Sequence, residues 1–446
     1  MAEICSSRID RLTGKTRPPG DKSISHRALM LGALAVGETR VSGLLDSEDV
    51  LATARALGAC GVPIERQATG EWRISGVGAG GLAEPESVLD FGNSGTGVRL
   101  MMGLLASQPL TATMTGDASL RRRPMGRVTT PLAMMGAAFA ARSGDRLPLI
   151  VKGANEPLPV DYTLPVASAQ VKSAILLAAL NTPGETAVIE PRPARDHTER
   201  MLTAMGAAIS VEDLAGGARR IALPGEAELR PLARLEVPAD ISSAAFPLVG
   251  AAIRPGSRIR LEGVGVNPLR TGLLAALAEM GVDIGSSRSR EMAGEPVADL
   301  ALAAPETLKA IDLDPALVPR MIDEFPVLFV AAACAEGRSR FTGLGELRIK
   351  ESDRLAVMAQ GLAACGVKLE EVEDGLIIHG TGRPPPGGAR IDAHLDHRIA
   401  MSFLVLGMAT GEPVTVEDAG PIATSFPGFT ELMNALGAGL EVLPRY

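Results

Sequence analysis

Hydrophobic residues along the chain predict two kinds of helix that alternate with short strands. Helices of the first kind are apolar on every side, which is typical of a helix that is buried all round. Helices of the second kind are apolar on one side only, as Val50, Ala54 and Leu57 show with their i, i+4, i+7 spacing. Runs such as 259–261 and 368–372 are typical of strands. The pattern predicts buried helices at 28–35, 98–106, 174–180, 244–253, 325–335 and 400–408.

A glycine follows each one-sided helix in nearly the same local sequence. The six glycines lie 70 to 85 residues apart and are Gly61, Gly136, Gly206, Gly281, Gly366 and Gly437. A glycine in this position is typical of a left-handed helix C-cap. The regular spacing predicts six copies of one unit, each with a buried helix, a strand, a second helix and a closing hairpin. The hairpin is clearest at 368–379, where Asp374 and Gly375 form the turn.

Six such units are too many for a single hydrophobic core, so we expect two domains of three units each. We place one domain at residues 21–235 and the other at residues 1–20 plus 236–446. The stretch 231–238, which begins and ends with proline, is the expected linker. The opening run 8–18 precedes the first helix, and we expect it to pair with the second half of the chain.

Composition limits the class of ligand and the compartment. The 446 residues carry a net charge of −8, which does not indicate nucleic-acid binding, so any anion must be held by locally concentrated cations. The four cysteines have no metal-type spacing and are too few for a disulfide framework, which favours a reducing cytoplasm. The N-terminus lacks a signal-peptide pattern, and no apolar run is long enough to span a bilayer. We therefore expect a cytoplasmic protein with no membrane partner.

Cations gather where the buried helices begin. In the first helix, Lys22, Ser23 and Arg27 occupy the opening turns, where free N–H groups and the helix dipole favour an anion. The third helix start likewise supplies Ser168 and Lys172. Two further basic clusters are expected on loops, at 121–127 and at 348–354. If the buried helices of each half run parallel, their N-termini can face one strongly positive cleft.

Five segments resemble the signature segments of the 5-enolpyruvylshikimate-3-phosphate synthase family, in the family's order. They are GDKSISHR at 20–27, GNSGT at 92–96, RPMG at 123–126, KESDR at 350–354 and DHR at 396–398. The resemblance implies an α/β (α+β) fold of two domains, each with three βαβαββ units, arranged as an inside-out α/β barrel. It also implies an enolpyruvyl transferase of the shikimate pathway for aromatic amino-acid biosynthesis, the target of glyphosate. Metal ions and organic cofactors are not expected.

The resemblance further implies which residues bind the two substrates. Shikimate-3-phosphate would be held by Lys22, Ser23, Arg27, Ser168, Gln170, Arg195, Asp323 and Lys350. Phosphoenolpyruvate would be held by Lys22, Gly95, Arg123, Gln170, Arg354 and Arg398. Arginine suits carboxylate and phosphate groups because its guanidinium can donate two parallel hydrogen bonds. Gly95 has no side chain, so the backbone there can approach a phosphate closely.

The family's reaction adds the 5-hydroxyl of shikimate-3-phosphate to C2 of phosphoenolpyruvate while C3 gains a proton. The tetrahedral product then loses phosphate. We expect Asp323 to take the hydroxyl proton, Glu351 to protonate C3 and Lys22 to serve the departing phosphate. Considered singly, Asp323 could instead cap a helix, and Glu351 could form a solvated i, i+3 pair.

Two other functions stay open at this point. One is a UDP-N-acetylglucosamine enolpyruvyl transferase, which works with a reactive cysteine on a loop, whereas the comparable loop here, 116–127, contains none. The other is a non-catalytic module that binds a sugar phosphate, and the two carboxylates argue against it. Sensitivity to glyphosate also stays open, because Gly95 matches sensitive members whereas 168–170 and 194–199 resemble a tolerant bacterial subclass. Ser425 stands where many members carry a lysine, and we expect the protein to act as a monomer.

Overall fold

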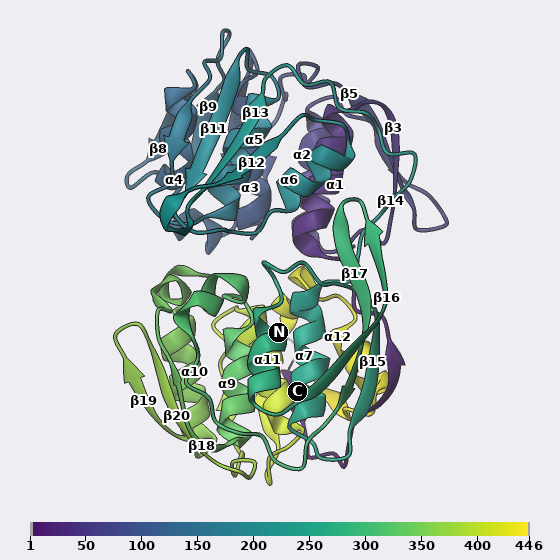
Figure 1. The fold of residues 1–446 in the computed structure, drawn as a ribbon, viewed down its shortest axis with the longest axis vertical. Coiled ribbons are helices and arrows are strands. Elements are labelled where there is room, and N and C mark those ends of the chain that lie inside the picture. The colour runs from purple at the N-terminus through teal and green to yellow at the C-terminus, as the bar shows by residue number, and fades with distance from the viewer. Residues whose placement is uncertain (1–2, 445–446) are drawn as a thin grey trace. The chain divides into compact units, whose positions relative to one another are not determined.

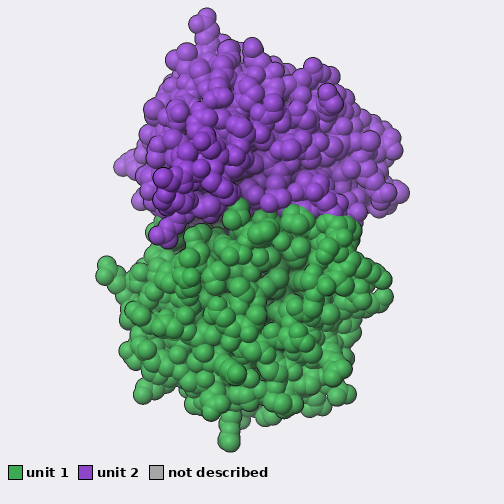
Figure 2. Space-filling model, in the orientation of Figure 1, with its two compact units in different colours: residues 1–19, 238–290, 296–446 green, residues 20–237, 291–295 purple. Residues whose placement is uncertain are grey.

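The computed structural model describes residues 3–444, which divide into two compact units (Figure 2). Unit 1 contains the residues up to Pro19, Pro238–Arg290 and the chain from Pro296 onward. Unit 2 contains Gly20–Val237 together with the short segment Glu291–Glu295. The chain therefore enters unit 2 twice, and the second entry is the tip of a hairpin.

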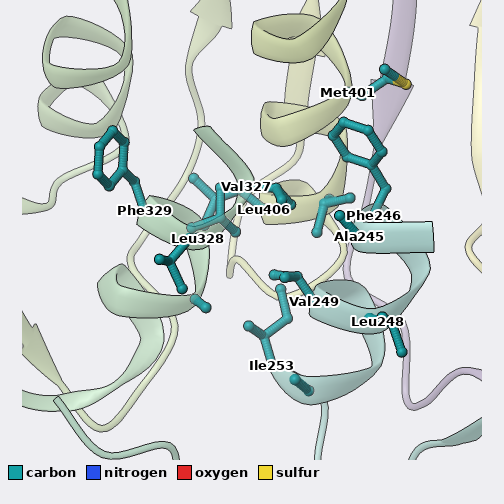
Figure 3. Packing of buried hydrophobic residues seen from close by; sticks show 14 of the residues in the cluster. Ala245, Phe246, Leu248, Val249, Ile253, Val327, Leu328, Phe329, Met401 and Leu406 are labelled. Carbon is teal, nitrogen blue, oxygen red and sulfur yellow. The ribbon is translucent and has the colours of Figure 1, made fainter. Parts of the chain in front are cut away.

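All six predicted apolar helices are present, three in each unit (Figure 1). Unit 2 contains α1 (Lys22–Leu34), α3 (Gly95–Ala106) and α5 (Ala169–Ala179). Unit 1 contains α7 (Ile241–Ala252), α9 (Phe325–Cys334) and α11 (His397–Gly407). These last three helices contribute Val249, Leu328 and Leu406 to one hydrophobic core (Figure 3). Burial among other helices and sheets explains why their sequences are apolar on all sides.

Side-chain caps begin five of the six buried helices. Asp21 Oδ1 accepts a hydrogen bond from the Ile24 N–H at 2.9 Å, and Ser94 Oγ accepts one from the Gly97 N–H at 3.1 Å. The other capping residues are Ser168, Asp240 and Asp396. Helix α9 is different, because it begins after Glu324, whose side chain makes no capping bond. The alternative role considered for Asp323, a helix cap, is therefore wrong.

The one-sided helices end in six nearly identical turns. They are α2 (Glu48–Ala59), α4 (Gly126–Met134), α6 (His197–Ala204), α8 (Gly272–Glu279), α10 (Arg354–Ala364) and α12 (Phe429–Ala435). Each predicted glycine follows its helix with φ between 85° and 102°, which favours a residue without Cβ. In the first turn, the Val62 N–H donates to the Leu57 carbonyl at 3.1 Å and the Gly61 N–H to the Gly58 carbonyl at 3.0 Å. The same pair of bonds recurs in all six turns, so the predicted left-handed C-caps are confirmed as Schellman motifs.

Unit 2 contains three small sheets, one for each repeated unit, and each joins a parallel strand pair to an antiparallel hairpin. The first has the order β14 (Leu235–Glu236), β3 (Val36–Ser42), β5 (Trp72–Val77), β4 (Ile64–Arg66). The second has the order β6 (Leu89–Asp90), β7 (Thr111–Thr115), β9 (Arg146–Lys152), β8 (Ala138–Arg142). The third has the order β10 (Asp161–Thr163), β11 (Glu185–Glu190), β13 (Arg219–Pro224), β12 (Ser210–Asp213).

Unit 1 contains the other three sheets, and together the six agree with the predicted α/β architecture. The first has the order β16 (Asp283–Met292), β17 (Glu295–Ala303), β15 (Arg258–Gly265), β2 (Thr13–Thr16). The second has the order β18 (Glu336–Phe341), β20 (Gly375–Thr381), β19 (Lys368–Val372), which confirms the predicted hairpin. The third has the order β21 (Arg390–Ile391), β22 (Val414–Val416), β1 (Glu3–Ser6), β23 (Leu440–Leu443).

The first sheet of each unit is completed by a strand from a crossing segment. Strand β2 precedes α1 in sequence, yet it pairs with β15 of unit 1, with Thr13 opposite Arg258. Strand β14 precedes α7, yet it pairs with β3 of unit 2, with Leu235 opposite Val41. The expected pairing of the opening run with the second half is thus confirmed. A hydrogen-bonded strand therefore lies just before the crossing at Pro19–Gly20 and just before the crossing at Val237–Pro238.

Candidate active site

Lys22 is the first residue of α1 and directly follows the capping residue Asp21. Its ammonium group lies 3.0 Å from Asp49 Oδ2 on α2, and its side chain remains 20% exposed. The charge therefore lies beside the free N–H groups of the helix start while solvent still reaches it. A cation in this position is suited to bind an anion together with the helix N-terminus.

Arg27 lies one turn further along α1 and is buried. Its guanidinium donates to Thr198 Oγ1 and Ser173 Oγ, both at 2.7 Å, and to the Ser23 carbonyl at 2.9 Å. These three acceptors are neutral, so they orient the guanidinium without cancelling its charge. Burial lowers the pKa of Arg27 to about 10, although the Glu199 carboxylate acts in the opposite direction. The group is still protonated at neutral pH.

His26 connects α1 to the start of α3. Its Nδ1 lies 2.8 Å from Thr53 Oγ1, and its Nε2 lies 3.5 Å from Ser94 Oγ, the cap of α3. Burial, followed by the charges of Lys22 and Arg27, lowers the pKa of His26 to about 3. The ring is therefore neutral at physiological pH, and it aligns two helix starts without adding to the charge of the site.

The start of α3 brings three of the predicted residues together. A Cβ at Gly95 would lie only 3.0 Å from Nη1 of Arg123 and 3.0 Å from Nη1 of Arg99, so both guanidinium groups lie close to bare backbone. Arg99 donates to Gln170 Oε1 at 3.0 Å, and Gln170 Nε2 donates to Thr96 Oγ1 at 2.9 Å. Gly95, Arg123 and Gln170 thus belong to one network that joins α3 and α5.

Arg123 follows the short 3-10 helix η1 (Leu120–Arg122), and its Nη2 donates to Asn93 Oδ1 at 2.8 Å. This bond holds the guanidinium beside the start of α3. Two other arginines of the cluster, Arg121 and Arg122, line a surface pocket of about 470 Å³. Its arginines are Arg121, Arg122, Arg142 and Arg146.

Lys172 does not have the role that the sequence indicated for it. Its side chain is completely buried in α5, with Nζ 2.9 Å from Glu190 Oε2 and 2.6 Å from Glu199 Oε1. The expectation of a cation that serves the third helix start is therefore wrong, because two buried carboxylates already neutralise this ammonium group.

Ser168 and Arg195 occupy the other two predicted positions in this part of unit 2. Ser168 Oγ caps α5 and accepts from the Val171 N–H at 3.4 Å. Arg195 is half-buried in the segment between β11 and α6. Its charge contributes to the lowered pKa of Arg27, so the two guanidinium groups are near one another.

Arg354, the first residue of α10, is the centre of a network in unit 1. Its side chain is 1% exposed, and it donates to Asp396 Oδ2 at 2.8 Å, Glu351 Oε2 at 2.5 Å and Asp323 Oδ1 at 3.4 Å. Burial alone would lower the pKa of Arg354, but the three carboxylates, Asp396 first, reverse this effect and raise it. The alternative of a solvated Glu351 pair is wrong, because its partner is buried.

The remaining predicted residues of unit 1 join the same network. Lys350 Nζ lies 3.4 Å from Asp323 Oδ1, and Arg398 Nη1 donates to the Asp323 carbonyl at 2.9 Å. The Arg398 N–H also donates to Asp396 Oδ1 at 3.0 Å. The structure therefore brings together all of the predicted site residues from this half of the chain: Asp323, Lys350, Glu351, Arg354 and Arg398.

The network of unit 1 is not the strongly positive surface that the helix starts suggested. Its cations are Lys350, Arg354 and Arg398, and the carboxylates that they contact are Asp323, Glu324, Glu351 and Asp396. Carboxylates thus balance the cations here. In unit 2, by contrast, Arg27 is oriented by neutral groups, so the charge available for an anion is greater there.

Sequence reasoning missed the residues that hold these side chains in place. Among them are Asn93, Thr198 and Asp396, which bond Arg123, Arg27 and Arg354 respectively. Asn93 and Asp396 lie inside segments that were already singled out, so a search for acceptors near each arginine could have found them. Thr198 also lies in a quoted segment, 194–199, but it is 171 residues from its partner, and nothing in that segment links it to Arg27.

Other features of the chain concern membranes, metals and thiols. No helix among residues 3–444 is both long enough and apolar enough to cross a membrane. The same residues contain no group of three or more His, Cys, Asp or Glu side chains that could hold a metal ion. The four cysteines are free thiols. Cys60 and Cys365 end equivalent helices, and burial raises the pKa of each to about 11.

Comparisons with known proteins cover nearly the whole chain. A family model described as EPSP synthase (3-phosphoshikimate 1-carboxyvinyltransferase) matches residues 7–433. A 3-phosphoshikimate 1-carboxyvinyltransferase of Paramagnetospirillum magneticum is 60% identical over 440 residues, which is 98% of either chain. A relative of the same name from Rhodospirillum rubrum is 59% identical and covers 98% of this chain and 97% of its own. A solved structure of EPSP synthase from Acinetobacter baumannii matches the full length of both chains, with a TM-score of 0.89 and 47% identity.

Proposed function

This chain belongs to the EPSP synthase (3-phosphoshikimate 1-carboxyvinyltransferase) family, and from this we propose that it is an enolpyruvyl transferase of the shikimate pathway. It transfers the enolpyruvyl group of phosphoenolpyruvate to the 5-hydroxyl of shikimate-3-phosphate and releases phosphate. The observation that carries the proposal is that the carboxylates of Asp323 and Glu351 both accept hydrogen bonds from the buried guanidinium of Arg354. Two fixed carboxylates can supply the proton transfers that addition and elimination require.

The proposed contacts to substrate are those expected from the family. Shikimate-3-phosphate is bound by Lys22, Ser23, Arg27, Ser168, Gln170, Arg195, Asp323 and Lys350. Phosphoenolpyruvate is bound by Lys22, Gly95, Arg123, Gln170, Arg354 and Arg398. The partial exposure of Lys22 lets a ligand reach its ammonium group, which is paired with Asp49, and the neutral partners of Arg27 leave the charge of that guanidinium available to an anion.

Each side chain then has a step in the chemistry. As the oxygen of the 5-hydroxyl attacks C2 of phosphoenolpyruvate, Asp323 accepts the hydroxyl proton. Glu351, in its protonated form, donates a proton to C3. The resulting tetrahedral intermediate carries the phosphate on C2. In the second step C3 returns a proton to Glu351 and the double bond re-forms. Phosphate leaves with help from the charge of Lys22 and takes up the proton that Asp323 accepted. The reaction uses side chains alone, so it needs no metal or organic cofactor.

The two alternative functions are not supported. The named relatives are enzymes of the shikimate pathway and not UDP-N-acetylglucosamine transferases. The buried thiols of Cys60 and Cys365 are poor nucleophiles, because their raised pKa keeps them protonated at neutral pH. A non-catalytic binding module would gain nothing from carboxylates placed beside the anions that it binds.

We also propose that the protein acts as a monomer in the cytoplasm, with one domain at residues 21–235 and the other at residues 1–20 plus 236–446. The free thiols support a reducing compartment. The hydrogen-bonded strands β2 and β14 support a division of the chain near these positions.

The function is tested by phosphate release from phosphoenolpyruvate in the presence of either shikimate-3-phosphate or UDP-N-acetylglucosamine. We expect release with shikimate-3-phosphate only, together with formation of the enolpyruvyl ether. Release with UDP-N-acetylglucosamine instead would establish the sister activity. Binding of shikimate-3-phosphate without any release of phosphate would show that the protein is a binding module.

A further inference from the structure

A surface pocket of unit 2 is lined by four arginines that the proposed chemistry does not use. The pocket has a volume of about 470 Å³, and its arginines are Arg121, Arg122, Arg142 and Arg146. Its other lining residues, Ala118 and Ser143, are small and uncharged. A pocket of this size lies in the usual range for small ligands. All of its charged groups are therefore cations, in a chain whose net charge is −8.

The four arginines come from two elements that pack together. Arg121 and Arg122 belong to η1, whereas Arg142 ends β8 and Arg146 begins β9. Helix η1 packs against β9, and Pro124, just after η1, forms a β-bridge with Arg146. Backbone contacts therefore fix the two sides of the pocket relative to one another.

No carboxylate neutralises these arginines. Among residues 3–444, no ion pair involves any of the four guanidinium groups. The carboxylates nearest to them in sequence are engaged elsewhere. Asp117 accepts from the Leu120 N–H and from Asn93 Nδ2, both at 2.7 Å. Asp145 Oδ2 faces the start of α4, where a Cβ on Gly126 would lie only 2.8 Å from it.

Two of the arginines oppose each other directly in the β8–β9 hairpin. Arg142 is paired with Arg146 in the register of the two strands. Like charges in such a cross-strand pair destabilise a sheet. A bound polyanion would relieve the repulsion, because each guanidinium would then face a negative charge. An arrangement that works against folding in this way is typical of a functional site.

We propose that this pocket binds an oligophosphate, that is, a chain of two or more linked phosphate groups. Arginine suits this ligand because its guanidinium can donate two parallel hydrogen bonds to phosphate oxygens. Four such groups match the charge of a triphosphate chain. The described lining contains no aromatic ring on which a base could stack, so the phosphate chain itself is the recognised part. Arg123 is not part of this lining, because its Nη2 donates to Asn93 beside the start of α3.

The test measures the binding of tripolyphosphate to the full chain by calorimetry, at physiological ionic strength and without divalent cations. We expect saturable binding, which Arg142→Gln and Arg146→Gln should each weaken by about tenfold or more, since each removes a charge-assisted hydrogen bond. Both positions are exposed, so the variants should fold normally. Arg234→Gln, at an exposed arginine of the same unit outside the pocket, is the matched control and should leave the dissociation constant unchanged.

ATP is the second probe, and it identifies the source of the phosphate chain. A dissociation constant close to that of tripolyphosphate would assign the pocket to the phosphate chain alone. A much lower dissociation constant, lost in the same two variants, would assign it to a nucleoside triphosphate.

Three results would overturn the inference. The first is a wild-type protein that shows no saturable binding of tripolyphosphate. The second is binding that Arg123→Gln abolishes but Arg142→Gln and Arg146→Gln preserve, because the anion would then lie in the proposed substrate site. The third is an equal loss of affinity in Arg234→Gln, which would show that only the general charge of the surface attracts the anion.

Discussion

Arg354 and Asp396 lie 42 residues apart in the chain and form a buried ion pair, with Arg354 Nε 2.8 Å from Asp396 Oδ2. Asp396 also caps α11 through the Arg398 N–H and accepts from Ser352 Oγ, both at 3.0 Å. One carboxylate therefore fixes both a guanidinium and a helix start. Because Asp396 is itself fixed at the start of α11, it holds the guanidinium of Arg354 in a defined orientation.

The Asp396→Ala variant should be strongly destabilised. The variant removes one of the three carboxylates that balance the buried Arg354 and also removes the cap of α11. Loss of a partner from a buried ion pair costs about 3–5 kcal/mol in the free energy of unfolding. Denaturant unfolding checks this value. The matched control is Glu417→Ala, which breaks an exposed ion pair with Arg390 and should leave the unfolding transition where it is. If the free energy of unfolding changed equally little in Asp396→Ala and Glu417→Ala, the remaining partners of Arg354 would be sufficient to balance its charge.

Gly95→Ala should weaken the binding of phosphoenolpyruvate. The added Cβ would lie 3.0 Å from Nη1 of both Arg123 and Arg99, so the guanidinium groups must move. A shift of about 1 Å in a positioning group can cost up to about a hundredfold in rate, and we expect KM for phosphoenolpyruvate to rise by about tenfold or more.

The control for this variant is Gly58→Ala on α2, where no atom lies within 4 Å of the new Cβ. It should leave KM unchanged and stabilise the protein by about 0.5–1 kcal/mol, as alanine does in a helix. An unchanged KM in Gly95→Ala would show that Arg123 does not contact the substrate.

The sequence predicted the repeated helices and their glycine turns because both depend on local signals. An all-apolar run followed at a fixed distance by a glycine specifies a buried helix and a Schellman turn without reference to the remainder of the chain. The grouping of Asp323, Lys350, Glu351, Arg354 and Arg398 was likewise predictable, since they lie within two quoted segments and one helix start.

What the sequence could not show depends on contacts between distant segments. Strand β14 is two residues long, and only its pairing with β3, nearly 200 residues earlier, makes it a strand. The burial of Lys172 was hidden for the same reason, because its partners are Glu190 and Glu199 in later elements. A lysine at a helix start has the same local sequence whether it faces solvent or a buried carboxylate.

His26 should make the stability of the protein depend on pH. Its pKa is about 3 in the folded protein against an ordinary value of 6.5, so below pH 6.5 the unfolded chain binds a proton that the folded protein does not. Stability therefore falls as the pH is lowered from 6.5 toward 3, and the loss due to this residue is about 2 kcal/mol at pH 5.

The measurement compares wild type with His26→Asn in denaturant unfolding at pH 7.5 and pH 5. The variant should be less stable at pH 7.5, because it loses the bond to Thr53, and the difference should shrink by about 2 kcal/mol at pH 5. Other titrating groups cancel in this comparison. A difference that stays constant across the two pH values would show that His26 does not contribute to the dependence.

Glu351→Gln should abolish most of the turnover while leaving the first substrate bound. Glutamine has the same length and can still accept the bond from Arg354 Nη2, which the carboxylate accepts at 2.5 Å, but it has no proton to exchange with C3. We expect kcat for phosphate release to fall by about 10²–10⁴-fold, the usual contribution of a general acid or base. The dissociation constant of shikimate-3-phosphate should stay within about twofold, because Glu351 is not among its proposed contacts.

The control for this variant is Glu371→Gln, which alters a partly exposed partner of Arg348 in the same unit and should keep the wild-type kcat. If Glu351→Gln retains normal turnover, then the proton of C3 comes from another group.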